Sequence, residues 1–217
     1  VVLHACCHNP TGVDLQPEDW KQILEVLRAN DHVPFIDIAY QGFGDNIEED
    51  AAAVRLFADS GMSFFVSSSF SKSFSLYGER VGALSMVTQN RDESARVLSQ
   101  IKRVIRTNYS NPPTHGATIV SAVLNSPELR AMWEAELGEM RSRIRELRLS
   151  MVEQLAAKGA KTDFSFVAAQ RGMFSYSGLT AEQVERLRVE FGVYAISTGR
   201  ICAAALNRNN IGHVTDA

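Results

Sequence analysis

Short apolar runs alternate with amphipathic segments in the first part of the chain. The apolar runs cover residues 1–8, 33–39, 63–68 and 81–87, and their length and flanking polar residues are typical of buried β-strands. Two helices are expected between them. Pro17 stands at a first helical position, followed by acidic residues, and residues 48–59 precede Gly61 as a C-cap. Strands that alternate with such helices predict βαβ units and a mostly parallel sheet.

Helical patterns dominate the second part of the chain. Ser126-Pro127-Glu128 predicts the start of a long helix that continues to about Lys158. Beyond Gly159 we expect strands at 164–168 and 173–176, then a helix at 180–191 and two further short strands. We interpret residues 1–125 as part of a large α/β domain. Residues 126–217 are interpreted as an interdomain helix and a smaller α+β domain.

Polar residues gather where the predicted strands end. In open α/β sheets, ligands bind beyond the carboxyl ends of the strands. The residues that fall at such ends are Asn9, Asp37, Tyr40, Ser69 and Lys72. The sequence therefore predicts a ligand site at this edge of the sheet.

The composition is that of an ordinary folded protein. Hydrophobic residues make up 45% and charged residues 22%, the formal net charge is -3, and Lys and Arg are scattered. These values argue against disorder and against a dedicated nucleic-acid surface, on which basic residues would cluster. No apolar stretch reaches the length of a bilayer span, and the first residues show no signal-peptide pattern. We expect no nucleic-acid partner and no membrane partner.

The cysteines favour a reducing compartment. Cys6, Cys7 and Cys202 are an odd number, and two of them are adjacent, which makes a poor disulfide framework and favours a cytoplasmic location. The chain has no initiator Met and opens directly in an apolar run. This suggests a fragment whose upstream part is absent.

Lys72 is the candidate catalytic residue. It lies in the segment Ser67-Ser68-Ser69-Phe70-Ser71-Lys72-Ser73-Phe74, directly after a predicted buried strand. A partly desolvated lysine loses its proton readily, and the neutral amine can form a Schiff base with a carbonyl group. A single lysine in a polar loop is more often a surface residue, so the neighbouring positions decide between the two interpretations.

The neighbours suit a phosphorylated cofactor that carries a ring cation. Ser69 and Arg80 offer a hydroxyl and a guanidinium fork for a phosphate ester. Asp37, at the end of an apolar strand, would be costly to bury unless it met a cation, and a pyridinium nitrogen is such a cation. The alternatives are a strand-end cap for Asp37 and a structural ion pair with Glu79 for Arg80.

Five separated motifs resemble, in the same order, those of the class I aminotransferases of fold type I, which use pyridoxal 5′-phosphate. They are His4–Gly12 with its Asn-Pro-Thr-Gly, Asp37–Phe43, Ser69–Lys72, Asn111-Pro112-Pro113 and Gly199-Arg200. The chain is most similar to the bacterial aromatic-amino-acid (tyrosine) and aspartate aminotransferases. The paired cysteines before Asn9 and the run Gln170–Tyr176 favour the tyrosine branch.

The resemblance implies an activity and a set of cofactor contacts. The enzyme would exchange the amino group between an aromatic or dicarboxylic L-amino acid and a 2-oxo acid such as 2-oxoglutarate. Lys72 would carry pyridoxal 5′-phosphate and then move the proton of the substrate α-carbon. Asp37 would keep the pyridine nitrogen protonated, and Asn9 and Tyr40 would hydrogen-bond the phenolic oxygen. The phosphate contacts would come from Ser69 and Arg80.

The resemblance also implies substrate contacts and a partner subunit. Arg200 would clamp the substrate α-carboxylate, with Asn9 beside it, and Phe174 would line the substrate pocket. Arg106 would reach into the partner's site to bind the distal carboxylate of dicarboxylic substrates, accompanied by Ser110. A homodimer with shared active sites follows from this arrangement.

The chain departs from the family pattern in one respect. A phosphate-binding loop, an aromatic residue that stacks on the cofactor ring and a cross-subunit tyrosine lie upstream of these motifs in the family. None of them has a counterpart in these residues.

Other interpretations stay open. His4, Cys6 and His8 alternate along a predicted strand and would share a face, as a metal site requires. A cysteine in a buried strand is more often a small apolar residue, so we expect no metal. The remaining alternatives are a dedicated aspartate aminotransferase, a non-catalytic cofactor-binding sensor and a lyase of the same fold acting on sulfur amino acids. Two carboxylate-binding arginines, Arg106 and Arg200, favour amino transfer.

Overall fold

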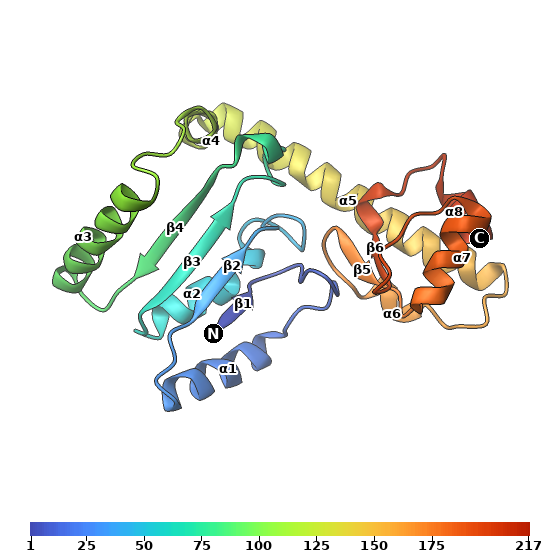
Figure 1. Ribbon diagram of the computed structural model, residues 1–217, viewed down its shortest axis with the longest axis horizontal. Helices are drawn as coiled ribbons and strands as arrows, with labels where there is room; N and C mark the ends of the chain where they lie inside the picture. The colour runs from blue at the N-terminus through green and yellow to red at the C-terminus, as the bar shows by residue number, and fades with distance from the viewer.

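The computed structural model describes residues 1–217. A four-stranded sheet with its helices forms one part, and a two-stranded sheet with its helices forms the other. One long helix runs between the two parts, and the two chain ends lie in different parts (Figure 1).

The larger sheet has the order β1-β2-β3-β4, with β1 at Val2–His4, β2 at Phe35–Ile38, β3 at Phe64–Ser69 and β4 at Gly82–Val87. The first two pairings are parallel and the third is antiparallel. No α-helix separates β3 from β4, only a short 3-10 turn, η2 (Tyr77–Glu79). The chain therefore turns back along β3, and the expected mostly parallel sheet is confirmed.

Two helices cover one face of this sheet: α1 (Pro17–Ala29) and α2 (Ala52–Asp59), the latter preceded by η1 (Glu49–Ala51). Phe57 is fully buried between Trp20 and Phe64, with ring centroids 6.1 Å and 5.7 Å away. Burying side chains of this size stabilises the fold by roughly 1.5–3 kcal/mol each. This core fixes the sheet on which the polar residues stand.

The opposite face of the sheet carries a row of polar residues. Because side chains alternate along a strand, Ile36 and Val66 point to the helices, and Asp37 and Ser67 point away. The strand register pairs His4 with Asp37 and Asp37 with Ser67. His4, Asp37 and Ser67 therefore lie side by side on three neighbouring strands.

The middle of the chain is helical: α3 (Arg91–Asn108), α4 (His115–Asn125) and α5 (Pro127–Ala157). The hydroxyl of Ser126 accepts a hydrogen bond from Leu129 N over 3.3 Å and caps α5. Leu137 and Ile144 belong to the core of the larger sheet, and Met151 belongs to a second core. The long helix thus joins both parts, as Figure 1 shows.

The C-terminal part is built around that second core. Its elements are α6 (Ser165–Ala168), β5 (Phe174–Tyr176), α7 (Ala181–Phe191), β6 (Arg200–Cys202), η3 (Ala203–Ala205) and α8 (Ile211–Asp216). Strands β5 and β6 pair antiparallel. Val167, Leu206 and Ile211 pack with Met151. The division of the chain at residues 125 and 126 stays a prediction.

Three details of the predicted elements are wrong. Residues 164–168 form no strand: Asp163 accepts a hydrogen bond from Ser165 N over 2.8 Å, and this cap starts the helical turn α6. Only one of the two expected final strands forms, because η3 and α8 follow β6. The first strand stops at His4 rather than at residue 8, since Cys7 has a left-handed backbone (φ 52°).

None of the helices combines the length with the apolar composition that crossing a membrane requires.

Candidate active site

Lys72 lies in a tight turn that follows β3. Phe74 N donates to Phe70 O over 3.3 Å, and Ser75 N donates to Lys72 O over 3.1 Å. The half-buried Lys72 side chain places Nζ 4.6 Å from the centre of the Tyr40 ring, within range of a cation–π contact. The candidate amine therefore lies above an aromatic face beside the sheet.

Four side chains next to Lys72 form a closed ring of contacts. Asn9 Nδ2 donates to the Tyr40 hydroxyl over 3.4 Å, and Arg200 Nη1 donates to Asn9 Oδ1 over 2.9 Å. The Arg200 guanidinium lies 4.6 Å from the centre of the Phe174 ring, which meets the Tyr40 ring edge-on at 6.2 Å. Residues from both sheets thus meet at one place.

Arg200 keeps most of its hydrogen-bonding capacity. Its side chain makes a single hydrogen bond, the one to Asn9, although a guanidinium has five N–H donors. The remaining donors can bind a carboxylate in a bidentate pair. The arrangement suits an acidic ligand held beside Lys72.

Asp37 has one oxygen held and one oxygen free. Oδ1 accepts a hydrogen bond from Ser67 Oγ over 2.7 Å, whereas Oδ2 lies 3.9 Å from His4 Nε2, too far for a hydrogen bond. No backbone N–H donates to this carboxylate. Asp37 is therefore no strand-end cap, and Oδ2 can accept a hydrogen bond from a ligand.

Ser69 and Arg80 lie near each other on adjoining segments. Ser69 pairs with Gly82 across β3 and β4, and Phe70 N donates to Val81 O over 3.2 Å. Arg80 is exposed and donates from Nη1 to Tyr77 O over 2.8 Å. Its remaining N–H donors are free.

The ion pair proposed as an alternative role for Arg80 does not form. The carboxylate of Glu79 instead contacts His115 Nδ1 at 2.8 Å. His115 is the first residue of α4.

The loop Asn9–Gly12 connects the two sheets. Arg171 N donates to Gly12 O over 2.7 Å, and Tyr176 N donates to Thr11 O over 3.2 Å. Gly12 has a φ of 71°, and a Cβ atom there would lie 2.6 Å from Phe174 O. Only glycine fits this close approach, which brings β5 against the loop that carries Asn9.

The electrostatics keep Tyr40 a neutral phenol. Burial raises the pKa of the Tyr40 hydroxyl, and the hydrogen bond from Asn9 opposes this shift only in part. The hydroxyl is therefore protonated near neutral pH and remains available as a hydrogen-bond donor to a ligand oxygen.

Arg106 and Ser110 lie apart from this cluster. Arg106 stands in the last turn of α3, is exposed, and bonds through Nη1 to Ser110 Oγ. Neither side chain contacts the residues around Lys72. Their predicted action in the site of a second subunit stays a prediction.

The metal alternative loses its geometric basis. The rings of His4 and His8 lie 4.8 Å apart, but Cys6 lies with Cys7 and Asp50 instead. The buried Asp50 carboxylate already accepts backbone N–H bonds, at 2.7–2.9 Å, from Gly42, Gly44 and Asp45. His4, Cys6 and His8 therefore do not gather as a trio, because the strand ends before Cys6.

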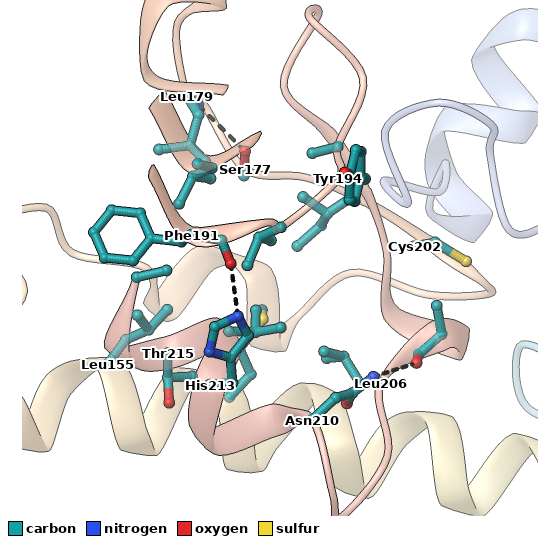
Figure 2. A pocket seen from close by; sticks show the side chains of 18 of the residues that line it. Leu155, Ser177, Leu179, Phe191, Tyr194, Cys202, Leu206, Asn210, His213 and Thr215 are labelled. Atoms are coloured by element: carbon teal, nitrogen blue, oxygen red, sulfur yellow. Dashed lines mark hydrogen bonds between the residues drawn. The ribbon is translucent and has the colours of Figure 1, made fainter. Parts of the chain in front are cut away.

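A hollow lies in the C-terminal part, between α5, α7 and α8 (Figure 2). It has a volume of about 540 Å³ and mostly apolar walls. His213 Nε2 contacts Phe191 O at 2.8 Å, and Leu179 N donates to Ser177 Oγ over 3.2 Å. None of the predicted site residues lines it, so it does not compete with the cluster around Lys72.

Sequence reasoning missed two contacts of Asp37. His4 and Ser67 lie in the segments singled out above, but neither was connected with Asp37. The pairing depends on the register of three strands, and a single sequence does not contain that register. The only local signal was a polar serine inside an apolar run.

The family model for "Aminotransferase class I and II" matches residues 1–217. The chain is 80% identical to an aspartate aminotransferase of Pseudomonas aeruginosa, over all of this chain and 54% of the relative. It is 52% identical to an aromatic-amino-acid aminotransferase of Escherichia coli, over all of this chain and 55% of the relative. The chain thus spans about half the length of these curated relatives.

Solved structures give the same result. An aromatic-amino-acid aminotransferase from Burkholderia pseudomallei, covalently bound to pyridoxal phosphate, matches with a TM-score of 0.97 and 70% identity, over 99% of this chain and 54% of that one. A psychrophilic aromatic-amino-acid aminotransferase from Psychrobacter sp. B6, cocrystallised with aspartic acid, matches with a TM-score of 0.96 and 49% identity, over 99% and 54%. With the sequence motifs, the fold and the family match in agreement, this chain belongs to the class I and II aminotransferases.

Proposed function

We propose that the protein is a pyridoxal-phosphate-dependent aminotransferase acting on aromatic and dicarboxylic L-amino acids, with a 2-oxo acid such as 2-oxoglutarate as amino acceptor. The observation that carries the proposal is the ring formed by Tyr40, Asn9, Arg200 and Phe174, with the Lys72 amine above Tyr40. It combines a candidate nucleophile, a carboxylate-binding fork and an aromatic wall. The named relatives support both substrate classes.

The residues present fit the cofactor. Asp37 offers a carboxylate oxygen without a hydrogen-bond donor, which suits a protonated ring nitrogen. Asn9 and Tyr40 offer an amide and a neutral phenol for the ring oxygen. Ser69 and the free donors of Arg80 suit a phosphate ester. Lys72 would hold the cofactor covalently.

When bound, pyridoxal phosphate supplies a ring that accepts electrons from the substrate α-carbon. The chain supplies the other functions. Arg200 holds the α-carboxylate, so that the α-hydrogen is oriented toward the Lys72 amine. That amine would act as the base that removes the proton from the substrate α-carbon and as the acid that returns it. Asp37 would hold a proton on the ring nitrogen.

Substrate side chains would meet two kinds of group. Phe174 presents an apolar wall beside Arg200, which suits an aromatic side chain. The exposed Arg106, with Ser110, would pair with a distal carboxylate in the partner's site. We therefore include a homodimer with shared sites in the proposal, and a cytoplasmic location consistent with three free thiols.

A dedicated aspartate aminotransferase is the second candidate. The specific observation in its favour is the 80% identity to the Pseudomonas aeruginosa aspartate aminotransferase. The 70% identity to a structure named for aromatic amino acids favours the broader activity.

A single half-reaction tests the proposal. The full-length protein, loaded with pyridoxal phosphate and freed of 2-oxo acids, is mixed with L-tyrosine or L-aspartate. We expect one equivalent of the corresponding 2-oxo acid per cofactor from each substrate, and no ammonia. Turnover of aspartate alone would favour the second candidate. Ammonia release, or no conversion of either substrate, would contradict amino transfer.

A further inference from the structure

We propose that Ser67 is a positioning residue for Asp37, whose carboxylate it holds oriented toward the cofactor ring. The inference rests on the function proposed above and adds a residue that this function does not include. Ser67 touches neither Lys72 nor the ring of four contacts. It acts only through the carboxylate to which it donates.

The strand register creates the contact. Asp37 on β2 and Ser67 on β3 are paired residues of neighbouring parallel strands, and both are half-buried on the face opposite the helices. Ser67 Oγ donates to Asp37 Oδ1 over 2.7 Å. The buried residues Ile36 and Ile38 flank Asp37 on β2, and the buried Val66 precedes Ser67 on β3, and together they fix this level of the sheet.

This single hydrogen bond gives the two carboxylate oxygens of Asp37 different roles. With Oδ1 engaged, the carboxylate cannot rotate freely, and Oδ2 is left as the acceptor for a ring N–H. A carboxylate oxygen held in this orientation is the acceptor that a protonated ring nitrogen requires.

The other titratable groups around Asp37 are few. His4 faces it from β1 at 3.9 Å, and the neutral phenol of Tyr40 follows it on the same segment. Beyond Tyr40 stand Lys72 and Arg200. None of these groups donates a hydrogen bond to the Asp37 carboxylate, so Ser67 is its hydrogen-bond donor among residues 1–217.

Loss of the Ser67 hydroxyl has a spectroscopic consequence. A proton on the ring nitrogen repels a second proton on the nitrogen that joins Lys72 to the cofactor, and so lowers the pKa of that nitrogen. A misoriented Asp37 holds the ring proton less firmly. The pH at which the cofactor's visible absorbance band is half converted, which reports the pKa of that nitrogen, should therefore rise.

The test compares variants of the full-length protein loaded with pyridoxal phosphate. Ser67→Thr and Ser67→Val form a matched pair of nearly equal shape, both suited to a strand, that differ in the hydroxyl. Ser67→Ala is the smaller truncation. Ser68→Ala is the control, because Ser68 is the next residue on β3, points to the other face and makes no side-chain hydrogen bond. Far-UV circular dichroism and urea unfolding check that each variant folds.

We expect Ser67→Val and Ser67→Ala to raise the absorbance midpoint, and to weaken cofactor binding about tenfold, as for loss of a hydrogen bond to a charged group. The turnover number kcat should fall with little change in KM for the amino acid, because Arg200 is untouched. Ser67→Thr and Ser68→Ala should keep the midpoint and affinity of the unsubstituted protein.

Two results would overturn the role of Ser67. One is an unchanged midpoint and affinity in Ser67→Val and Ser67→Ala, and the other is an equal shift in Ser68→Ala. In both cases the unsubstituted protein would still convert its substrates. If that protein showed no visible band with pyridoxal phosphate, the proposed function itself would fail, and the role of Ser67 with it.

Discussion

Arg200 donates a hydrogen bond to Asn9 over 2.9 Å, although 191 positions separate the two residues in the chain. Asn9 follows the first strand of the larger sheet, and Arg200 begins the last strand of the smaller one. The candidate carboxylate clamp is therefore assembled from both parts. Its geometry depends on the loop Asn9–Gly12 and on α5, which hold the parts together.

Replacing Arg200 with lysine should weaken substrate binding. Lysine keeps the charge but loses the planar fork that binds a carboxylate with two hydrogen bonds and also donates to Asn9. We expect kcat/KM for L-aspartate and for L-tyrosine to fall together by about a hundredfold, in line with two lost charge-assisted bonds. Arg208→Lys, at an exposed arginine without a side-chain partner, is the control. Equal kinetics for Arg200→Lys and Arg208→Lys would contradict the clamp.

Gly12→Ala should destabilise the protein through a steric clash at the junction of the two sheets. The added Cβ would lie 2.6 Å from Phe174 O, at a φ of 71°. Urea unfolding should show a loss of roughly 3 kcal/mol or more, since both backbone strain and the clash contribute. Gly178→Ala has a similar φ of 76° but no atom within 4 Å, and should cost only about 1–2 kcal/mol. Equal losses in the two variants would exclude the clash as the cause.

Trp133 of α5 anchors the lysine turn. Its Nε1 donates to Ser73 O over 2.6 Å, and its ring stacks on Phe74 at 4.5 Å. Trp133→Phe keeps an aromatic ring but removes the donor, so we expect a loss of about 1–3 kcal/mol in urea unfolding and weaker cofactor binding. Met132→Ala, at an exposed neighbour, should change stability by less than about 0.5 kcal/mol. Unchanged cofactor binding in Trp133→Phe would contradict a role in placing Lys72.

The buried Asp50 should make stability depend on pH. Burial raises the pKa of its carboxyl, and three backbone N–H groups offset this only in part. The folded protein therefore binds this proton more tightly than the unfolded chain, in which an aspartate has a pKa of about 3.9. The stabilising contribution is present below that value and is lost as pH rises through the folded-state pKa.

Asp50→Asn removes this titration. The free energy of unfolding of the unsubstituted protein should fall, relative to that of Asp50→Asn, as the pH rises from about 4. Urea unfolding at a series of pH values measures the difference. A difference that stays constant would show that the hydrogen bonds offset burial completely, and a change in the opposite direction would show that they outweigh it.

Arg106 should discriminate between the substrate classes. Arg106→Ala removes a cation that we place opposite the distal carboxylate of a dicarboxylic substrate in the partner's site. The value of kcat/KM should fall at least about tenfold for L-aspartate, as for loss of a charge-assisted bond, and much less for L-tyrosine. Arg103→Ala, also exposed on α3, should affect neither. Equal losses for both substrates would contradict the assignment.

Local signals in the sequence predicted the long elements well. Ser126 and Pro127 predict the start of α5, and the helix indeed begins at Pro127 and ends at Ala157. The helix expected at 180–191 forms at Ala181–Phe191, with Thr180 as its cap. Such signals act within one turn of the chain, so a single sequence is sufficient to recognise them.

Short apolar runs were less informative. The residues 164–168 suit a strand or a buried turn equally well, and the hydrogen bonds of Asp163 with Ser165 decide for the turn. The left-handed Cys7, whose N–H is held by Asp14 over 2.7 Å, ends the first strand earlier than its apolar pattern predicts. Local hydrogen bonds from side chains to the backbone override periodicity in both cases.

The candidate site was predicted as a set of residues, but its contacts were not. The motifs indicated Asn9, Asp37, Tyr40 and Lys72, and the structure gathers them at one edge of the sheet. The contact between Asp37 and Ser67 depends on strand register, which no local signal encodes.

The attachment of the cofactor to Lys72 is the central claim, and chemical trapping tests it most directly. The full-length protein loaded with pyridoxal phosphate is reduced with borohydride, digested and analysed by peptide mass spectrometry, with Lys72→Ala in parallel. We predict one phosphopyridoxyl group per chain, on the peptide that contains Lys72, and none in the variant. Labelling of another lysine, or no labelling of the unsubstituted protein, would contradict the account.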